Sequence, residues 1–309
     1  MPRFIRQAPP TALILAIGLL VGVSFTLSKI VAMAAAPPLL ALFWQVAVAS
    51  AALSAVLIAQ RQRPSVAPRV VVYYLGAGVL GVTLPALIGY AVLGHVSAGF
   101  YASLVTLSPL FTFAFSAGLE RRMLPLHRLA GILLGLFGIS LATLRGFDFA
   151  GVAPIWIGLA LCGPAVLAAG NVFRSRAYPA GADPMGLAAG TLLLQTLLIG
   201  IGLLGFGDPG ASAALAPPVF AAIAGIGGIT AVSYALTFEV QRRTDGVGFS
   251  QVGYFATLSG IGFGALVFGE RISPVLVLSL GLLFLGVAIT NGHLRLPRVR
   301  GRLKAFLQG

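Results

Sequence analysis

The chain has 309 residues, of which 58% are hydrophobic and only 9% charged, and its formal net charge is +13. A soluble globular domain carries about 25% charged residues, so the composition excludes that class and indicates an integral membrane protein. The basic residues lie between apolar runs rather than on one surface, which is how topology signals are distributed. We therefore expect no nucleic-acid partner.

Apolar runs recur along the chain at the length of about twenty residues that a helix needs to cross a bilayer core of about 30 Å. We expect ten membrane-spanning helices, at 11–35, 38–60, 69–94, 96–119, 125–145, 152–177, 184–206, 217–240, 246–269 and 272–292. The first run resembles a secretory signal, but it exceeds the usual apolar region of about 7–15 residues. We interpret it as an uncleaved first helix.

The distribution of Lys and Arg predicts the orientation of these helices. With the N-terminus inside, most of the basic residues fall in inner segments, including Arg174 and Arg176 at the end of the sixth span, and the outer loops hold only Arg145 and Arg271. Such an excess on one side marks the cytoplasmic face. We expect a multi-pass protein of the cell inner membrane with both termini in the cytoplasm.

Two stretches of the chain, 99–144 and 249–291, repeat one another at a shift of 150 residues. The matching pairs are Phe113 with Phe263, Glu120 with Glu270, Arg121 with Arg271, Leu126 with Leu276, Gly131 with Gly281, and Leu133 with Leu283. Five helices per half is an odd number, so the second half must enter the membrane from the opposite side. The repeat predicts the inverted architecture of alternating-access carriers.

The expected fold is therefore all-α, with ten transmembrane helices forming two inverted five-helix repeats around a central cavity. The first repeat covers residues 1–147, the second covers 148–294, and a basic cytoplasmic tail covers 295–309. The tail interleaves apolar and basic residues, a pattern of an interfacial anchor on anionic lipid or of a solvated topology signal.

Three prolines, Pro85, Pro109 and Pro164, fall near the centres of their spans. A proline inside a helix frees the carbonyl four residues earlier, here those of Gly81, Val105 and Ala160. A freed carbonyl cannot face lipid. One such proline favours a packed kink, whereas three at similar depth favour a cavity and hinges for gating.

The candidate substrate-binding residues are the polar and aromatic side chains within the spans. They are Trp44, Gln45, Thr83, Tyr90, Tyr101, Asn171, Ser233, Tyr234 and Tyr254. The alternatives are hydrogen bonds between helices for the hydroxyls and an interfacial belt for the aromatic residues nearest the membrane surfaces. Lys29, the one basic residue well inside a span, is either functional or extended to the interface.

Some chemistry is excluded by what the sequence lacks. No carboxylate falls at mid-membrane, where a proton- or sodium-coupled carrier generally needs one, so we expect facilitated, gradient-driven movement and leave coupling to an ion open. The three histidines lie at span ends, and no HExxH or Gly-x-Ser-x-Gly motif occurs. We expect no enzyme activity, no metal and no cofactor.

The helix, Glu-Arg turn and glycine-rich helix that end each half resemble the drug/metabolite transporter superfamily. Within it, Ser108-Pro109-Leu110, Glu120, Gly131 and Gly138 are similar to the ten-helix EamA-type branch, and particularly to its aromatic amino-acid exporters. Gln45 stands where many relatives carry an arginine. The resemblance implies a monomeric carrier that exports small metabolites.

Together these features predict export of a neutral amino acid with an aromatic or large apolar side chain. Such a solute suits a largely apolar pocket with a few oriented polar groups, and Gln45 and Asn171 are expected to hold its ammonium and carboxylate. The alternative is an exporter of lipophilic cations or of other small metabolites.

Overall fold

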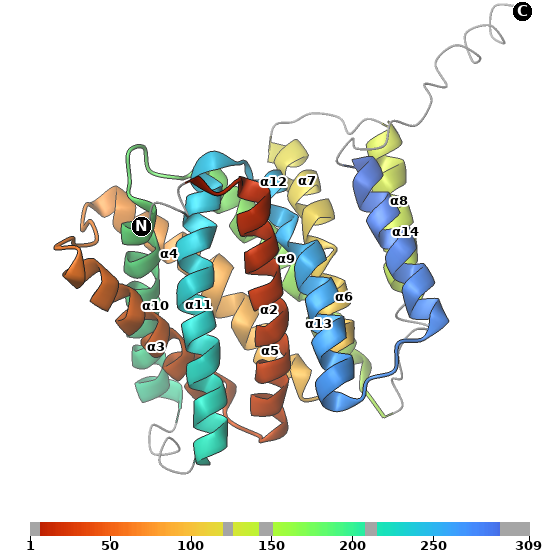
Figure 1. Cartoon of the computed structure of the whole chain (residues 1–309), viewed down its shortest axis with the longest axis horizontal. Helices are drawn as coiled ribbons and strands as arrows, with labels where there is room; N and C mark the ends of the chain where they lie inside the picture. Colours follow the sequence, from red (N-terminus) through yellow and green to blue (C-terminus); the bar gives the residue numbers. More distant parts are fainter. Residues whose placement is uncertain (1–6, 120–125, 142–150, 208–214, 291–309) are drawn as a thin grey trace, which may run out of the picture.

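The computed structural model describes residues 7–119, 126–141, 151–207 and 215–290, and every regular element within these ranges is a helix (Figure 1). The elements are α2 (Pro10–Met33), α3 (Pro38–Ala59), α4 (Pro68–Gly78), η1 (Val79–Thr83), α5 (Leu84–Leu93), α6 (Ala98–Val105), α7 (Ser108–Leu119), α8 (Leu126–Leu141), α9 (Pro154–Arg176), α10 (Pro184–Phe206), α11 (Pro217–Arg243), α12 (Gly246–Ser250), α13 (Val252–Phe268) and α14 (Pro274–Thr290).

Within the described ranges, eight helical stretches are long and apolar enough to cross a membrane. Three of them combine consecutive elements: Pro68–Leu93, Ala98–Leu119 and Gly246–Phe268. The other two of the ten expected spans correspond to α8 and α14, whose apolar parts, Leu129–Gly138 and Pro274–Gly286, are shorter. The all-helical membrane fold is confirmed, while the number ten stays a prediction.

Proline marks the start of seven of these helices. Pro10, Pro38, Pro68, Pro154, Pro184, Pro217 and Pro274 are each the first helical residue. Proline is favoured there because the first amides of a helix have no partner within it and the ring fixes φ in the helical range. Elsewhere a side chain caps the helix: Ser97 accepts from Phe100 N at 3.0 Å and begins α6. The boundaries therefore follow local chemistry.

Three of the expected spans are interrupted rather than continuous, and the ninth span breaks at Gln251, between α12 and α13. The third contains η1, a turn of π-helix, directly before Pro85, and the fourth breaks at Thr106 and Leu107, between α6 and α7. At this break, Thr257 of α13 hydrogen-bonds the hydroxyl of Thr106 and donates to Ala102 O at 2.7 Å. By contrast, Pro164 leaves α9 continuous.

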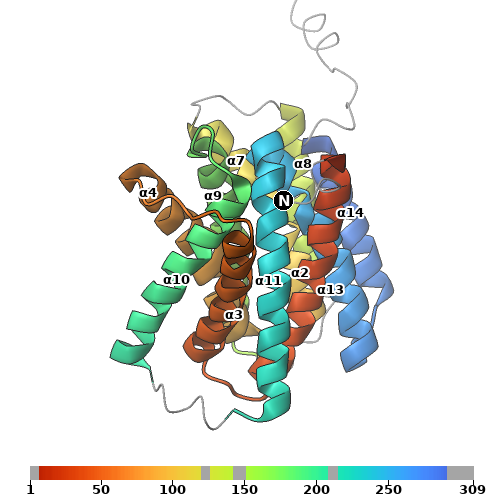
Figure 2. The same ribbon diagram turned by 60° about the vertical axis from the view of Figure 1, so that its left-hand side comes forward.

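The helices α8 and α14 form a closely packed pair at one edge of the bundle, opposite α3, α4 and α10 (Figures 1 and 2). A Cβ built on Gly286 would meet Gly131 O and Gly135 N, each at 2.5 Å. The two backbones approach this closely only because glycines face one another. The Glu120 turn that precedes α8 lies outside the described residues.

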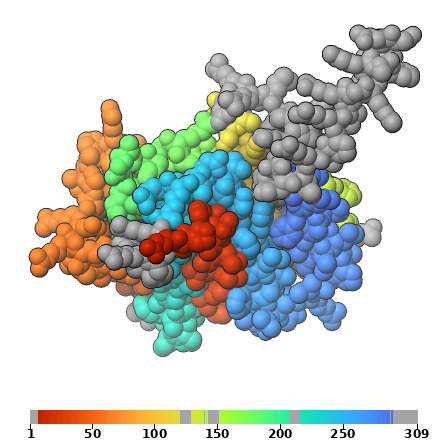
Figure 3. Space-filling view, turned by 45° about the horizontal axis from the view of Figure 1, so that its top comes forward, coloured from red at the N-terminus to blue at the C-terminus, as the bar shows by residue number. Residues whose placement is uncertain are grey.

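The helix α2 lies between α11 and α13, and the three are adjacent in the space-filling view (Figure 3). Glycines allow the contact with α13, because a Cβ on Gly22 would come within 2.4 Å of Ser259. On this side Ser259 Oγ also donates to Leu19 O at 3.0 Å. The helix α2 is thus fixed to helices from the second half, and its other face borders an internal cavity.

Candidate functional site

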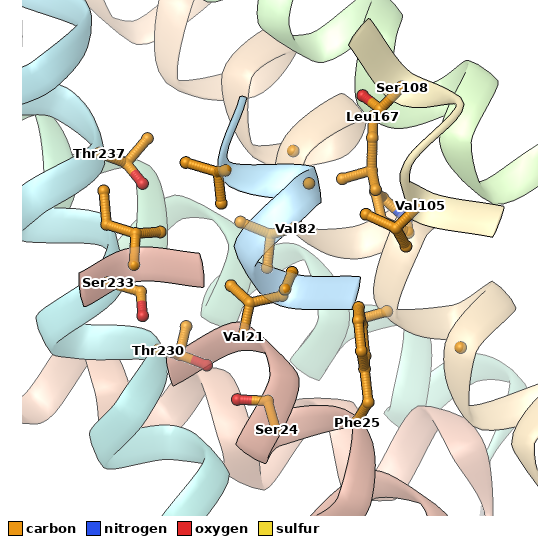
Figure 4. A pocket seen from close by; sticks show the side chains of 18 of the residues that line it. Val21, Ser24, Phe25, Val82, Val105, Ser108, Leu167, Thr230, Ser233 and Thr237 are labelled. Carbon is orange, nitrogen blue, oxygen red and sulfur yellow. The ribbon is translucent and has the colours of Figure 1, made fainter. Parts of the chain in front are cut away.

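A cavity of about 210 Å³ lies between helices of both halves of the chain. The helices α2, α3, α5, α6 and α7 line it from the first half, with η1, and α9, α11, α12 and α13 line it from the second. Figure 4 shows Thr230, Ser233 and Thr237 along α11 on one side, and Val105, Ser108 and Leu167 on the other. The lining is mostly apolar, with hydroxyls concentrated on α11.

Seven of the thirteen binding and gating candidates line this cavity. They are Gln45, Pro85, Tyr90, Tyr101, Asn171, Ser233 and Tyr234. Gln45 is 8% exposed, and both ends of its amide are bonded: it donates to Thr230 Oγ1 at 2.9 Å and accepts from the Tyr90 hydroxyl at 2.8 Å. This network joins α3, α5 and α11 at the cavity wall, so Gln45 and Tyr90 hold the wall in shape.

Three of the nine binding candidates do not line the cavity. Trp44 packs edge-to-face against Phe43 and Phe220, with ring centroids 5.4 Å apart in both pairs. Thr83 donates to Gln195 Oε1 of α10 at 2.6 Å. The ring of Tyr254 packs at 90° to that of Phe284. Of the gating candidates, Lys29, Pro109 and Pro164 also lie outside the lining.

The π-helical turn η1 accepts a hydrogen bond from a tyrosine of α11, in the second half of the chain. Pro85 has no N–H to donate, and Gly81 O, four residues earlier, accepts a hydrogen bond from the Tyr234 hydroxyl of α11. The expected freed carbonyl is therefore present at Gly81 and is satisfied from across the cavity. A π-turn of this kind inside a helix is frequent at functional sites.

The residue that sequence reasoning missed is Arg174. It was interpreted as one of the inner topology residues, but it lines the cavity and is 3% exposed. Its Nη2 donates to Asn171 Oδ1 at 2.8 Å, its guanidinium also meets the Tyr234 hydroxyl, and its Cζ lies 5.7 Å from the Phe249 ring centroid. The signal available in the sequence was the spacing Asn171-x-x-Arg174, which places both side chains on one helix face.

An ion pair lies one residue beyond the cavity, at the end where α2 finishes. Lys29 Nζ is 2.6 Å from Glu270 Oε1, and the side chains are 15% and 16% exposed. The same carboxylate accepts from the amides of Ala98 and Gly99, both at 2.9 Å. Lys29 also lies over the Phe268 ring. Glu270 thus joins α2, the start of α6 and the end of α13 at one point.

Within the described ranges, no group of His, Cys, Asp and Glu side chains is placed to hold a metal ion. The groups present in the cavity are aromatic faces, hydroxyls, two amides and one guanidinium. Such groups can make hydrogen bonds and aromatic contacts with a small solute.

Comparison with known proteins agrees with this arrangement. Residues 10–144 match the EamA-like transporter family. The eight membrane-length helices indicate a multi-pass membrane protein, and its first part is similar to the EamA-like transporter family. The resemblance to the drug/metabolite transporter superfamily is confirmed at this level, and the finer likeness to aromatic amino-acid exporters stays a prediction.

The fold also occurs in a solved structure, described only as "Crystal structure of protein". The TM-score is 0.65 and the identity 19%, over 98% of this chain and 100% of the other. At this identity the likeness concerns the fold alone. No curated protein matches the chain.

Proposed function

We propose that the protein is an inner-membrane carrier that exports neutral amino acids with aromatic or large apolar side chains. The match to a transporter family supports transport of small metabolites. The observation that carries the proposal is the cavity between the two halves, whose apolar wall is interrupted by a few oriented polar groups. An amino acid has matching parts, an apolar body and a compact polar head.

The aromatic residues of the wall supply the apolar contact. Phe25 and Tyr101 meet edge-to-face, with ring centroids 5.4 Å apart, and both border the cavity. Aromatic pairs add about 0.5–1.5 kcal/mol beyond the burial of their area. A volume of about 210 Å³ lies below the roughly 300 Å³ at which pockets for drug-sized ligands begin, which favours a small metabolite over a large drug.

The alternative, export of lipophilic cations, has less support. A cation in an apolar cavity needs a carboxylate or a similar counter-charge. None of the residues that line this cavity is acidic, while one, Arg174, carries a positive charge.

For the mechanism we propose alternating access, in which one inverted half moves against the other. The packing of corresponding helices supports this proposal: α3 packs on α10, α6 on α13, and α8 on α14. The interruptions before Pro85 and before Pro109 provide places where helices can bend without breaking further hydrogen bonds. The Lys29–Glu270 pair holds one end closed in this conformation.

The proposal is tested by counterflow in proteoliposomes that contain the purified protein. Labelled Phe, Tyr, Trp, Met and Thr are compared with a quaternary ammonium dye, with empty liposomes as the control. We expect saturable uptake of the aromatic amino acids and of Met. Uptake of the dye without uptake of any amino acid would replace the proposal with the cation exporter.

A further inference from the structure

Arg174 differs from the basic residues that mark the cytoplasmic side of a membrane protein, because its side chain is buried. It lies in the last turn of α9, where basic side chains are common because they complement the helix dipole and reach water. Arg176, two residues later, is exposed. The Arg174 side chain instead packs inward against Gly81, where its Nη1 occupies the space that a Cβ would take, 1.8 Å from the ideal Cβ position.

The charge of Arg174 has no counterion in the described part of the chain. The ion pairs there join Lys29 to Glu270, and Arg242 and Arg243 to Glu239. A buried charge that is not paired is costly, and neither the carbonyl of Asn171 nor the face of Phe249 carries a full negative charge. An unpaired guanidinium in a cavity wall offers charge-assisted hydrogen bonds to an anion that enters the cavity.

Two polar groups at the cavity have no partner of their own. Arg174 Nε and Ser233 Oγ are both buried and without a hydrogen bond in the described structure. The rest of the guanidinium is fixed by Asn171 and Tyr234. The guanidinium is therefore preorganised, and an unused N–H donor lies on one of its edges.

Building on the proposed function, we propose that Arg174 binds the carboxylate of the transported solute and that this contact selects carboxylates over amines and cations. Arginine pairs with carboxylate through parallel charge-assisted hydrogen bonds, which are about twice as strong as neutral ones. The planar fork also fixes the orientation of the solute head. The apolar side chain then extends along the wall lined by Phe25 and Tyr101.

The inference is tested with three solutes of one shape: phenylalanine, 3-phenylpropionate without the amine, and 2-phenylethylamine without the carboxylate. Each competes with labelled phenylalanine in proteoliposomes, and phenyl phosphate serves as a second anion. We expect both carboxylates to compete and the amine to compete at least about tenfold less well, as the loss of a charge-assisted bond implies. If phenyl phosphate competes more strongly than the two carboxylates, the site binds phosphate esters and the carboxylate assignment is overturned.

The matched variants are Arg174→Gln and Arg176→Gln. Arg174→Gln should raise the half-saturating concentration of phenylalanine at least about tenfold and leave the weak competition by the amine unchanged, while Arg176→Gln should resemble the wild type. Should Arg174→Gln fail to fold, the wild type still provides a test: the two carboxylates should raise its melting temperature and the amine should not.

The outcomes separate this inference from the proposed function. If amino acids are transported with an unchanged half-saturating concentration in Arg174→Gln, or if the amine competes as well as phenylalanine, the role of Arg174 is refuted and the amino-acid carrier stands. If 3-phenylpropionate is transported and no amino acid is, the proposed function fails and the carboxylate site stands.

Discussion

At the scale of single residues, the missing side chain of Gly81 shapes the site as much as any group that is present. The Arg174 guanidinium occupies the space of its Cβ, and the Tyr234 hydroxyl lies 3.3 Å from the same point. Gly81→Ala should therefore displace the guanidinium without removing its charge. We expect the half-saturating concentration for a carboxylate solute to rise about tenfold, the effect of weakening one charge-assisted bond, as measured by uptake into proteoliposomes.

The control for this substitution is Gly228→Ala on α11. No atom lies within 4 Å of a Cβ built there, so transport should not change. Equal kinetics for Gly81→Ala and the wild type would mean that the position of the guanidinium does not matter to binding.

Some residues of the site could be predicted from the sequence, and one could not. Polar and aromatic side chains inside an apolar span usually face a cavity or another helix rather than lipid. This rule predicts the positions of Gln45, Tyr90, Asn171 and Tyr234. Arg174 was not predictable, because a basic residue at the end of a span normally extends to water. The Arg174 side chain can point into the cavity because Gly81 has no Cβ, and Gly81 is 93 positions earlier in the chain.

At the scale of whole helices, two glycines of α14, Gly281 and Gly286, differ in how closely they pack against α8. A methyl group at Gly286 would overlap backbone atoms of α8, whereas one at Gly281 meets nothing within 4 Å. Gly286→Ala should lower the melting temperature in detergent, with a loss of about 1–3 kcal/mol as for other overpacked sites. Gly281→Ala should be neutral or stabilising by up to about 1 kcal/mol, because alanine favours the helix. Identical melting curves would contradict the close packing.

The helices themselves were largely predictable, and their interruptions were not. Length, apolar composition and a leading proline locate α3, α10 and α11 to within a few residues, because each of these signals acts locally. The π-helical turn η1 depends on a hydroxyl from α11, and the break before α7 depends on Thr257 of α13. No local pattern contains those partners, so Pro85 and Pro109 predict bends in the third and fourth spans but neither the π-helical turn nor the break before α7.

At the scale of the whole molecule, the orientation in the membrane has a direct test. Ala34, between α2 and α3, and Ser65, between α3 and α4, are both exposed. In a Cys162→Ala background, a cysteine at position 34 should react with an impermeant maleimide added to intact cells, and a cysteine at position 65 should react only after permeabilisation. The excess of basic residues on the side of Ser65 is the physical reason. The opposite labelling pattern would invert the assignment.

The closure at the Glu270 end can be followed by the same labelling. A cysteine in place of Ser28, which borders the cavity next to Lys29, should be protected from reagent on that side. Adding Glu270→Gln removes the charge that holds Lys29 and weakens the bonds to Ala98 and Gly99, so labelling should become at least about tenfold faster, since hydrogen bonds to charged groups contribute about 1.5–3 kcal/mol each. The cysteine at position 34 should label equally in both backgrounds. Unchanged protection at position 28 would show that the ion pair does not close this end.

In the proposed alternating-access mechanism, an end closed by the contacts of Glu270 with Lys29, Ala98 and Gly99 would make the two faces of the carrier kinetically unequal. Each hydrogen bond to this carboxylate favours one conformation over its alternative, and a bias of 1.4 kcal/mol is already tenfold in population. A bias confined to the empty carrier makes its return to the favoured face fast, so both the half-saturating concentration and the maximal rate should be higher from that face. Detailed balance requires the ratio of maximal rate to half-saturation to be the same in both directions for a neutral solute. The ion pair therefore sets how the carrier responds to concentration on each side, while the direction of net movement is left to the gradient.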